Sequence, residues 1–137
     1  MAIADYTVAR IDELEPYYNG IFLKARAALG VTAFGLSIVD IPAGSVHYPE
    51  HNHPSGQEEV LIVLKGFGRL VLNEGVEHVD IEPGMMVRIG AKTKRTIQVG
   101  DEGLQAVAIG GVPGQAYEPL PYTELGALDP LLKRPGT

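Results

Sequence analysis

Cysteine and tryptophan are both absent from this chain of 137 residues. Without cysteine the protein has no disulfide, no thiolate nucleophile and no zinc site built on cysteine ligands. A fold that needs no disulfide suits a reducing compartment, and we therefore expect a cytoplasmic protein.

Long apolar runs and an excess of positive charge are also missing. No apolar stretch approaches the ~20 residues that a membrane-spanning helix needs. The N-terminal segment 1–15 carries acidic side chains and has no long apolar core, so it does not resemble a signal peptide. The 11 Lys and Arg side chains are outnumbered by 17 Asp and Glu, which gives a net charge of −6. Because nucleic-acid binding requires a basic face, we do not expect nucleic acid as a partner. Because no apolar stretch is long enough, we do not expect a membrane either.

Glycine and proline, in contrast, are abundant, with 17 and 10 residues. In a chain that is 45% apolar, this composition favours many short strands joined by turns. Gly66, Gly75 and Gly84 are expected to be turn formers with positive φ. The short apolar segments between the turns predict an all-β sandwich or barrel. These segments are residues 31–41, 59–65, 68–72, 76–81, 85–89, 95–99 and 104–109.

The length suits one domain over residues 1–137. We expect a barrel core over about 31–110, an N-terminal extension over 1–30 and a C-terminal tail over 111–137. In the extension, residues 11–15 favour a helical turn, and residues 22–29 suit either a helix or a strand. The tail is too apolar to be free, so it is expected to pack against the barrel or a partner subunit. Its Tyr117 and Tyr122 would cap the barrel or lie in a dimer interface.

Three of the four histidines, His47, His51 and His53, lie within seven residues. On a strand, side-chain alternation puts His51 and His53 on one face. A Pro-Ser-Gly turn follows, and the apolar strand that begins at Glu58 and Glu59 would return opposite the histidines. Two imidazoles and one carboxylate form a facial triad, which leaves coordination positions open on a transition-metal ion.

These residues resemble the first motif of the cupin superfamily, in which a glycine, HxH, a glutamate and a second glycine follow one another. Glu59 has the motif's spacing to Gly66, whereas Glu58 has the motif's spacing to the histidines. Neighbours on a strand point to opposite faces, so only one of the two can lie inside. We take Glu59 as the ligand and Glu58 as its alternate. The matching residues are Gly44, His51, His53, Glu59 and Gly66.

The second cupin motif is weaker, because it opens at Gly84 but has Arg95 at its histidine position. An inward Arg95 would put a permanent cation where a fourth ligand belongs, and that charge opposes a divalent ion. Three alternatives follow. Arg95 turns outward and leaves three ligands; His47 replaces the missing ligand; or there is no metal, and Arg95 pairs with Glu59 or with an anionic ligand.

The resemblance implies a double-stranded β-helix, or jelly-roll, barrel with N- and C-terminal extensions and a pocket at the histidines. It also implies a homodimer and a metal-dependent enzyme, dioxygenase- or isomerase-like, that acts on a small organic molecule. One divalent transition-metal ion per chain (Fe, Mn, Ni, Cu or Zn) would bind His51, His53 and Glu59. The alternative is a metal-free cupin that binds a small anionic ligand through Arg95 without transforming it, with Gln57 as a further candidate contact.

Several other residues are given structural interpretations. Gln57 and the basic segment 92–95 are expected to face water, and His78, which lies between acidic residues, is expected on the surface. Met85 and Met86 are expected to fill the core.

Overall fold

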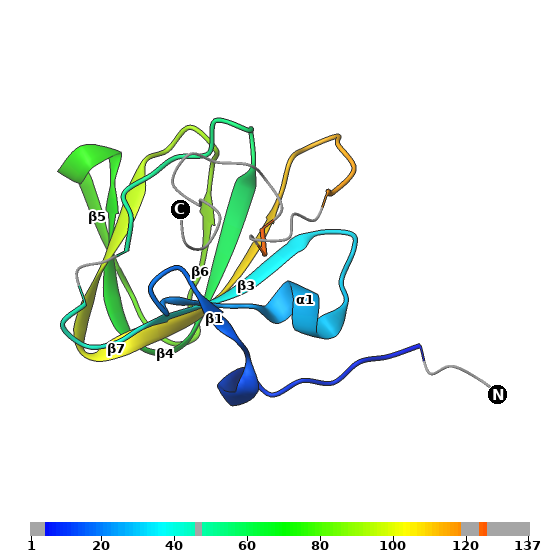
Figure 1. Cartoon of the computed structure of the whole chain (residues 1–137). Coiled ribbons are helices and arrows are strands. Elements are labelled where there is room, and N and C mark those ends of the chain that lie inside the picture. The colour runs from blue at the N-terminus through cyan, green and yellow to red at the C-terminus, as the bar shows by residue number, and fades with distance from the viewer. Residues whose placement is uncertain (1–4, 46–47, 119–123, 126–137) are drawn as a thin grey trace.

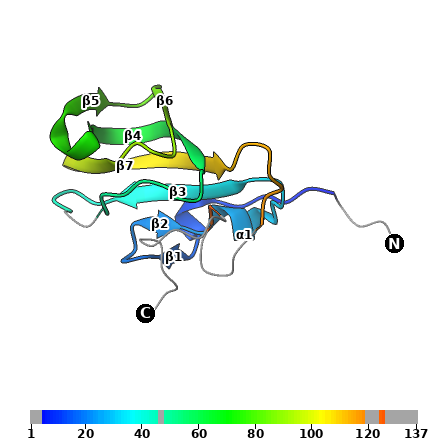
Figure 2. The same ribbon diagram turned by 90° about the horizontal axis from the view of Figure 1, so that it is seen from above.

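A computed structural model describes residues 5–45, 48–118 and 124–125. Antiparallel strands dominate these residues, as the turn-rich sequence predicts, and form one sheet (Figures 1 and 2). The strands are β1 (Pro16–Tyr17), β2 (Phe22–Leu23), β3 (Gly35–Ile41), β4 (Glu58–Leu72), β5 (Glu77–Ile81), β6 (Met86–Ile89) and β7 (Arg95–Gly111). The helical elements are the 3-10 turns η1 (Ile11–Glu13) and η2 (Asn73–Gly75) and the short helix α1 (Ala25–Leu29).

The sheet has the strand order β1-β2-β3-β7-β4-β5, and β6 pairs with β4 beside this path. Figure 2 shows the strands side by side from β6 and β4 through β7 and β3 to β2 and β1. The long strands β4 and β7 pair along both halves, and the register shifts where β4 passes Gly66. Such irregularities bend a strand, so this pair curls and encloses an interior (Figure 1).

The sequence predicts breaks at Gly66 and at residues 100–103, and this prediction is wrong. Gly66 has a φ of +83°, as expected, but this conformation bulges β4 instead of ending it. Pairing with β7 continues on both sides, so residues 58–72 form one strand and residues 95–111 another. Residues 22–29, for which a helix or a strand was expected, divide into β2 and α1.

An apolar core fills most of the interior between the sheet's inward faces. Leu61 on β4, Leu70 further along β4, and Ala106 on β7 have no exposed surface. A second, smaller cluster of Leu23, Ala25 and Ile38 joins β2, α1 and β3. Packing in these clusters holds β4 and β7 in place, and the ends of these two strands carry the polar residues described below.

The described end of the C-terminal tail packs against the barrel, as its apolar composition predicts. A Cβ atom on Gly35 would collide with the backbone of Leu125, so glycine makes this contact possible. Leu36 donates its backbone N–H to the Glu124 carbonyl at 2.8 Å. The Tyr117 hydroxyl donates to the same carbonyl at 3.1 Å, whereas Tyr122 lies outside the described residues.

The Glu124 side chain anchors this segment to α1. Its carboxylate accepts a hydrogen bond from the Ala27 backbone N–H at 2.7 Å and lies 3.5 Å from the Arg26 guanidinium. Since the Glu124 side chain is 5% exposed and that of Arg26 is 13% exposed, this ion pair is shielded from water.

Two expectations for single residues have opposite outcomes. His78 is exposed, as expected. Met85 packs against the core, but Met86 is 73% exposed, because strand alternation turns it outward. In the part of the chain that the structure describes, no helix is long and apolar enough to cross a membrane.

Gly66→Ala is expected to destabilise the protein much more than Gly75→Ala. Both glycines have positive φ, which costs an alanine about 1–2 kcal/mol. At Gly66 the added Cβ would also collide with the Gly103 carbonyl oxygen, and overpacking adds about 1–3 kcal/mol, whereas nothing lies within 4 Å at Gly75. Urea unfolding of the two variants measures the difference, and equal losses of stability would contradict the bulge.

Candidate functional site

Five polar side chains are buried in the interior that β4 and β7 enclose. None is more than 4% exposed, although polar residues of these types usually lie at the surface. They come from three parts of the chain: the loop before β4, the start of β4 and the start of β7. The five are His51, His53, Gln57, Glu59 and Arg95.

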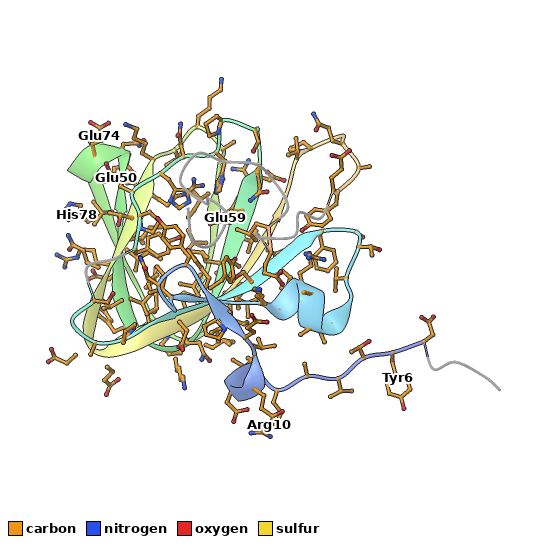
Figure 3. The ribbon with its side chains drawn as sticks, viewed as in Figure 1. Tyr6, Arg10, Glu50, Glu59, Glu74 and His78 are labelled. Carbon is orange, nitrogen blue, oxygen red and sulfur yellow. The ribbon has the colours of Figure 1, made fainter. Side chains whose placement is uncertain are left out.

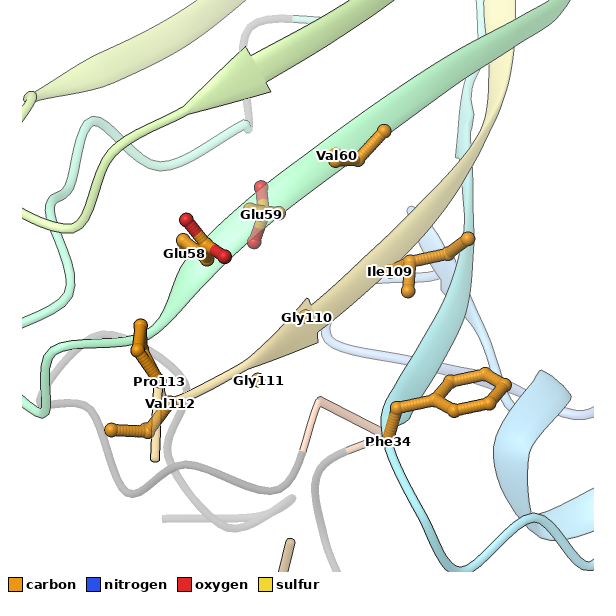
Figure 4. A pocket seen from close by; sticks show the side chains of 9 residues that line it. All are labelled: Phe34, Glu58, Glu59, Val60, Ile109, Gly110, Gly111, Val112 and Pro113. Carbon is orange, nitrogen blue, oxygen red and sulfur yellow. The ribbon is translucent and has the colours of Figure 1, made fainter. Parts of the chain in front are cut away.

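Glu58 and Glu59 lie on opposite sides of β4, as Figure 4 shows. The Glu58 carboxylate pairs at 3.0 Å with Arg88 on the outer surface. Glu59 is 2% exposed, and its Oε2 lies 3.2 Å from Nε2 of His53, which donates the hydrogen bond. Figure 3 shows Glu59 inside the molecule, while Glu74 and His78 lie at the periphery. The inward carboxylate is therefore the one with the motif's spacing to Gly66.

His51 lies against His53, with ring centroids 4.9 Å apart and the rings nearly perpendicular. Its Nδ1 donates to the Pro49 carbonyl at 2.8 Å, which leaves the lone pair of the neutral ring on Nε2. Burial is the main cause that lowers the pKa of His51, so the ring is neutral at neutral pH. A neutral imidazole of this kind is able to accept a proton or to bind a metal ion.

The charge of Glu59 is stabilised in spite of its burial. Desolvation alone would raise the pKa of this carboxyl group, but the hydrogen bond and the charge interaction with His53, with a smaller contribution from the positive charge of Arg95, outweigh it. The net result is a lowered pKa, and Glu59 is therefore a carboxylate at neutral pH.

Arg95 points into the interior, which excludes the alternative in which it turns outward and makes it an exception within the segment 92–95 that was expected to face water. Its neighbour Lys94 is the residue that faces out, and it pairs with Glu74 at 2.7 Å. Arg95 forms a two-way backbone bridge with His51, and its side chain has no exposed surface. Arg95 is the first residue of β7 and its side chain takes the inward face, whereas Lys94 lies in the loop before the strand.

The Arg95 guanidinium has few partners inside the protein. Nη1 donates to the His51 carbonyl at 3.4 Å and Nη2 to the Gly90 carbonyl at 3.3 Å, and both contacts are long. Nε is buried, and no described residue accepts a hydrogen bond from it. Among the described residues, no carboxylate lies within 4.0 Å of this cation.

Gln57 is buried, although a position facing water was expected. Its side chain is 1% exposed, and the described residues provide no hydrogen bond to either polar atom of the amide. The sequence spacing could have predicted this burial. Gln57 lies two residues before the inward-facing Glu59, and residues two apart in an extended chain face the same side.

The described residues do not fit a divalent metal ion. His51, His53 and Glu59 are the right types of ligand, but no three His, Asp or Glu side chains among the described residues are arranged to hold an ion. The carboxylate of Glu59 already pairs with His53, and the buried cation of Arg95 would repel an added ion. His47, the alternate ligand, lies outside the described residues.

A pocket of about 310 Å³ lies where the start of β4 meets the end of β7 (Figure 4). Its walls include Phe34 before β3, Val60 on β4 and Ile109 on β7. The lining also includes Glu58 and the strand partners Glu59 and Gly110. The pocket therefore adjoins the strand ends that carry the buried polar residues.

The chain folds as an antiparallel jelly roll with an enclosed polar site. Several solved structures have a similar fold. A cupin protein of Bacteroides fragilis is 22% identical, with a TM-score of 0.65, over 93% of this chain and 98% of that one. A predicted oxalate decarboxylase of Thermotoga maritima is 22% identical, with a TM-score of 0.61, over 77% and 99% of the two chains. The DMSP lyase DddQ of Ruegeria pomeroyi is 25% identical, with a TM-score of 0.52, over 63% and 42%.

No protein-family model matches the chain, and no curated protein sequence matches it. The similarity in structure nevertheless extends over nearly the whole chain. The chain therefore has the cupin fold that the sequence led us to expect.

Arg95→Met is expected to raise the pKa of both Glu59 and His51. The guanidinium favours the charged form of Glu59 and the neutral form of His51, so its removal weakens both effects. NMR titration of the carboxyl and imidazole carbons measures the two pKa values. Arg69→Met removes an exposed arginine and should change neither value. Unchanged values in Arg95→Met would show that the guanidinium does not face the site.

Proposed function

We propose that this cupin binds a small organic anion in its interior and that Arg95 anchors the anion. The burial of the Arg95 cation carries the proposal, because the described residues give it two long contacts to carbonyls and no ion pair. Burying a cation costs several kcal/mol unless a counter-charge and hydrogen bonds compensate. A carboxylate matches the guanidinium fork and would supply both.

The neighbours of Arg95 favour an organic ligand over an inorganic ion. His51 offers a neutral imidazole, and Glu59 with His53 offers a hydrogen-bonded carboxylate. A ligand held by Arg95 would therefore meet two proton acceptors, the neutral imidazole of His51 and the carboxylate of Glu59, and a general base is one of the groups that acid–base catalysis uses. Proteins named as a lyase and a predicted decarboxylase share the fold, which supports a small-molecule role.

The second candidate is a metal-dependent enzyme, dioxygenase- or isomerase-like, with a divalent ion on His51, His53 and Glu59. The observation in its favour is that these three residues are buried in one interior, with the two imidazoles in contact. The inward cation of Arg95 is the observation against it.

Purified without a chelator or a histidine tag, the protein is expected to hold far less than one transition-metal ion per chain. Small carboxylates should raise the melting temperature of the wild type and of Arg69→Met, but not of Arg95→Met. Elemental analysis and thermal denaturation measure the two quantities. One ion per chain that is lost in His51→Ala would overturn the proposal and establish the second candidate.

Arg95→His is expected to convert the site into a metal site. The substitution removes the repelling charge and supplies the imidazole that the second cupin motif has at this position. A divalent ion should then bind near one per chain and raise the melting temperature. Reconstitution with Mn²⁺ or Zn²⁺ tests this, and a variant that takes up no more metal than the wild type would contradict the charge argument.

We also propose a homodimer that pairs through the outer faces of β4 and β6. Leu64 is 40% exposed on β4 and Met86 is 73% exposed on β6, next to its strand partner Ile62. Light scattering should give a mass of about 30 kDa, twice the 14.7 kDa of one chain. Met86→Lys should dissociate the dimer, and Val76→Lys, which charges an exposed valine beside η2, should not. A wild-type monomer would contradict the proposal.

A further inference from the structure

We infer that Gln57 is a specificity-determining residue and that the ligand is a hydroxycarboxylate, whose hydroxyl group meets the Gln57 amide. The inference rests on the proposed function, since it concerns the same interior, and it adds the second group by which the ligand is recognised. Arg95 would take the carboxylate, and Gln57 would distinguish the ligand from an acid without the hydroxyl.

The Gln57 amide is buried without hydrogen bonds. Its side chain is 1% exposed, and neither Oε1 nor Nε2 has a partner among the described residues. A buried amide left in this state destabilises a protein, and nearly all buried polar groups in native structures are paired. A group retained at such a cost is expected to have its partner in a bound molecule.

The backbone of β7 makes room for this amide. A Cβ atom on Gly110 would lie 2.9 Å from Nε2 and 3.1 Å from Cδ of Gln57, so the side chain fills the space above a residue that has none. Gly110 is the strand partner of Glu59. Gln57 therefore lies beside the inward carboxylate and belongs to the same interior as the other buried polar residues.

Polar side chains occupy this end of the two strands, and apolar ones occupy the rest. Beyond Glu59, the inward positions of β4 are Leu61 and Val63, and beyond Gly110 those of β7 are Ala108 and Ala106. An apolar residue at position 57 would thus continue the core. Core packing alone therefore does not explain why position 57 carries an amide.

The chemistry of the amide defines the group that it would recognise. It offers one acceptor oxygen and two N–H donors, so its best partner both donates and accepts, as a hydroxyl group does. A buried site built to bind a hydroxyl rejects the analogue without it, because the amide is then left unpaired. Arg95 supplies the positive charge that a carboxylate needs. A hydroxycarboxylate is therefore the class of ligand that matches both Arg95 and the Gln57 amide.

Pairs of acids that differ in hydroxylation test the inference: lactate and propionate, malate and succinate, gluconate and hexanoate. Titration calorimetry on the wild type should show at least one pair in which the hydroxy acid binds about tenfold more tightly or better. Gln57→Leu should bind both members of that pair with similar affinity. A wild type that binds no member of the panel, or that shows no preference in any pair, would overturn the inference.

The stability of the free protein supplies a second readout. Gln57→Leu should raise the melting temperature by a few degrees, because it replaces an unpaired amide by an apolar side chain. Gln105→Leu is the matched control, since the amide of Gln105 donates to Asp40 at 3.3 Å and its loss should not stabilise the protein. A lowered melting temperature in Gln57→Leu would show that the amide is already paired, for example by a buried water, and would count against the inference.

Two neighbouring glycines provide a test that leaves Gln57 in place. Gly110→Ala should displace the amide and weaken the preference for the hydroxy acid, whereas Gly111→Ala, which has nothing within 4 Å, should not. Equal behaviour of the two variants would contradict the placement of the amide.

Failure of this inference is distinguishable from failure of the proposed function. If Arg95→Met binds the acids as the wild type does, the proposed function fails. If Arg95→Met loses binding while Gln57→Leu keeps the preference of the wild type, the assignment of Gln57 alone is wrong.

Discussion

The buried guanidinium of Arg95 is the constraint on which the interior depends. A permanent cation inside a barrel has to be balanced. Its charge adds to the burial that keeps His51 neutral and to the hydrogen bond from His53 that keeps Glu59 a carboxylate. The same charge opposes a divalent ion next to these residues. These charges are the reason why we propose an anionic ligand.

The pairing of β4 with β7 sets the geometry around this charge. The bulge at Gly66 lets one pair of strands continue through a bend, so that a curled sheet encloses the site. Because alternation assigns one face of each strand to the interior, β4 places Glu59 inside and Glu58 outside, and β7 begins with Arg95 on its inward face. The pairing register of β4 and β7 thus determines both the core packing and which polar side chains face the interior.

Much of this architecture was predictable from local patterns. The turn-rich composition indicates the all-β fold, and the spacing to Gly66 selects Glu59 over Glu58. Spacing alone did not predict the continuity of β4, because a positive φ suits a turn and a bulge equally well. It also left the orientation of Arg95 open and favoured an exposed Gln57, since polar side chains are usually at the surface and only the tertiary fold shows which face they take. Arg95 and Gln57, which are buried although polar side chains usually lie at the surface, are the residues that we propose to contact the ligand.

The Nε–H resonance of Arg95 tests the central claim most directly. This N–H is buried and has no hydrogen-bond partner among the residues that the structure describes, so a bound carboxylate would supply one. Titration of ¹⁵N-labelled protein with gluconate, malate or lactate should shift this resonance and saturate at one ligand per chain, with little effect on the exposed Arg69. If the resonance of Arg95 stays unchanged while any of these acids binds, the anion does not lie on Arg95, and the account is wrong.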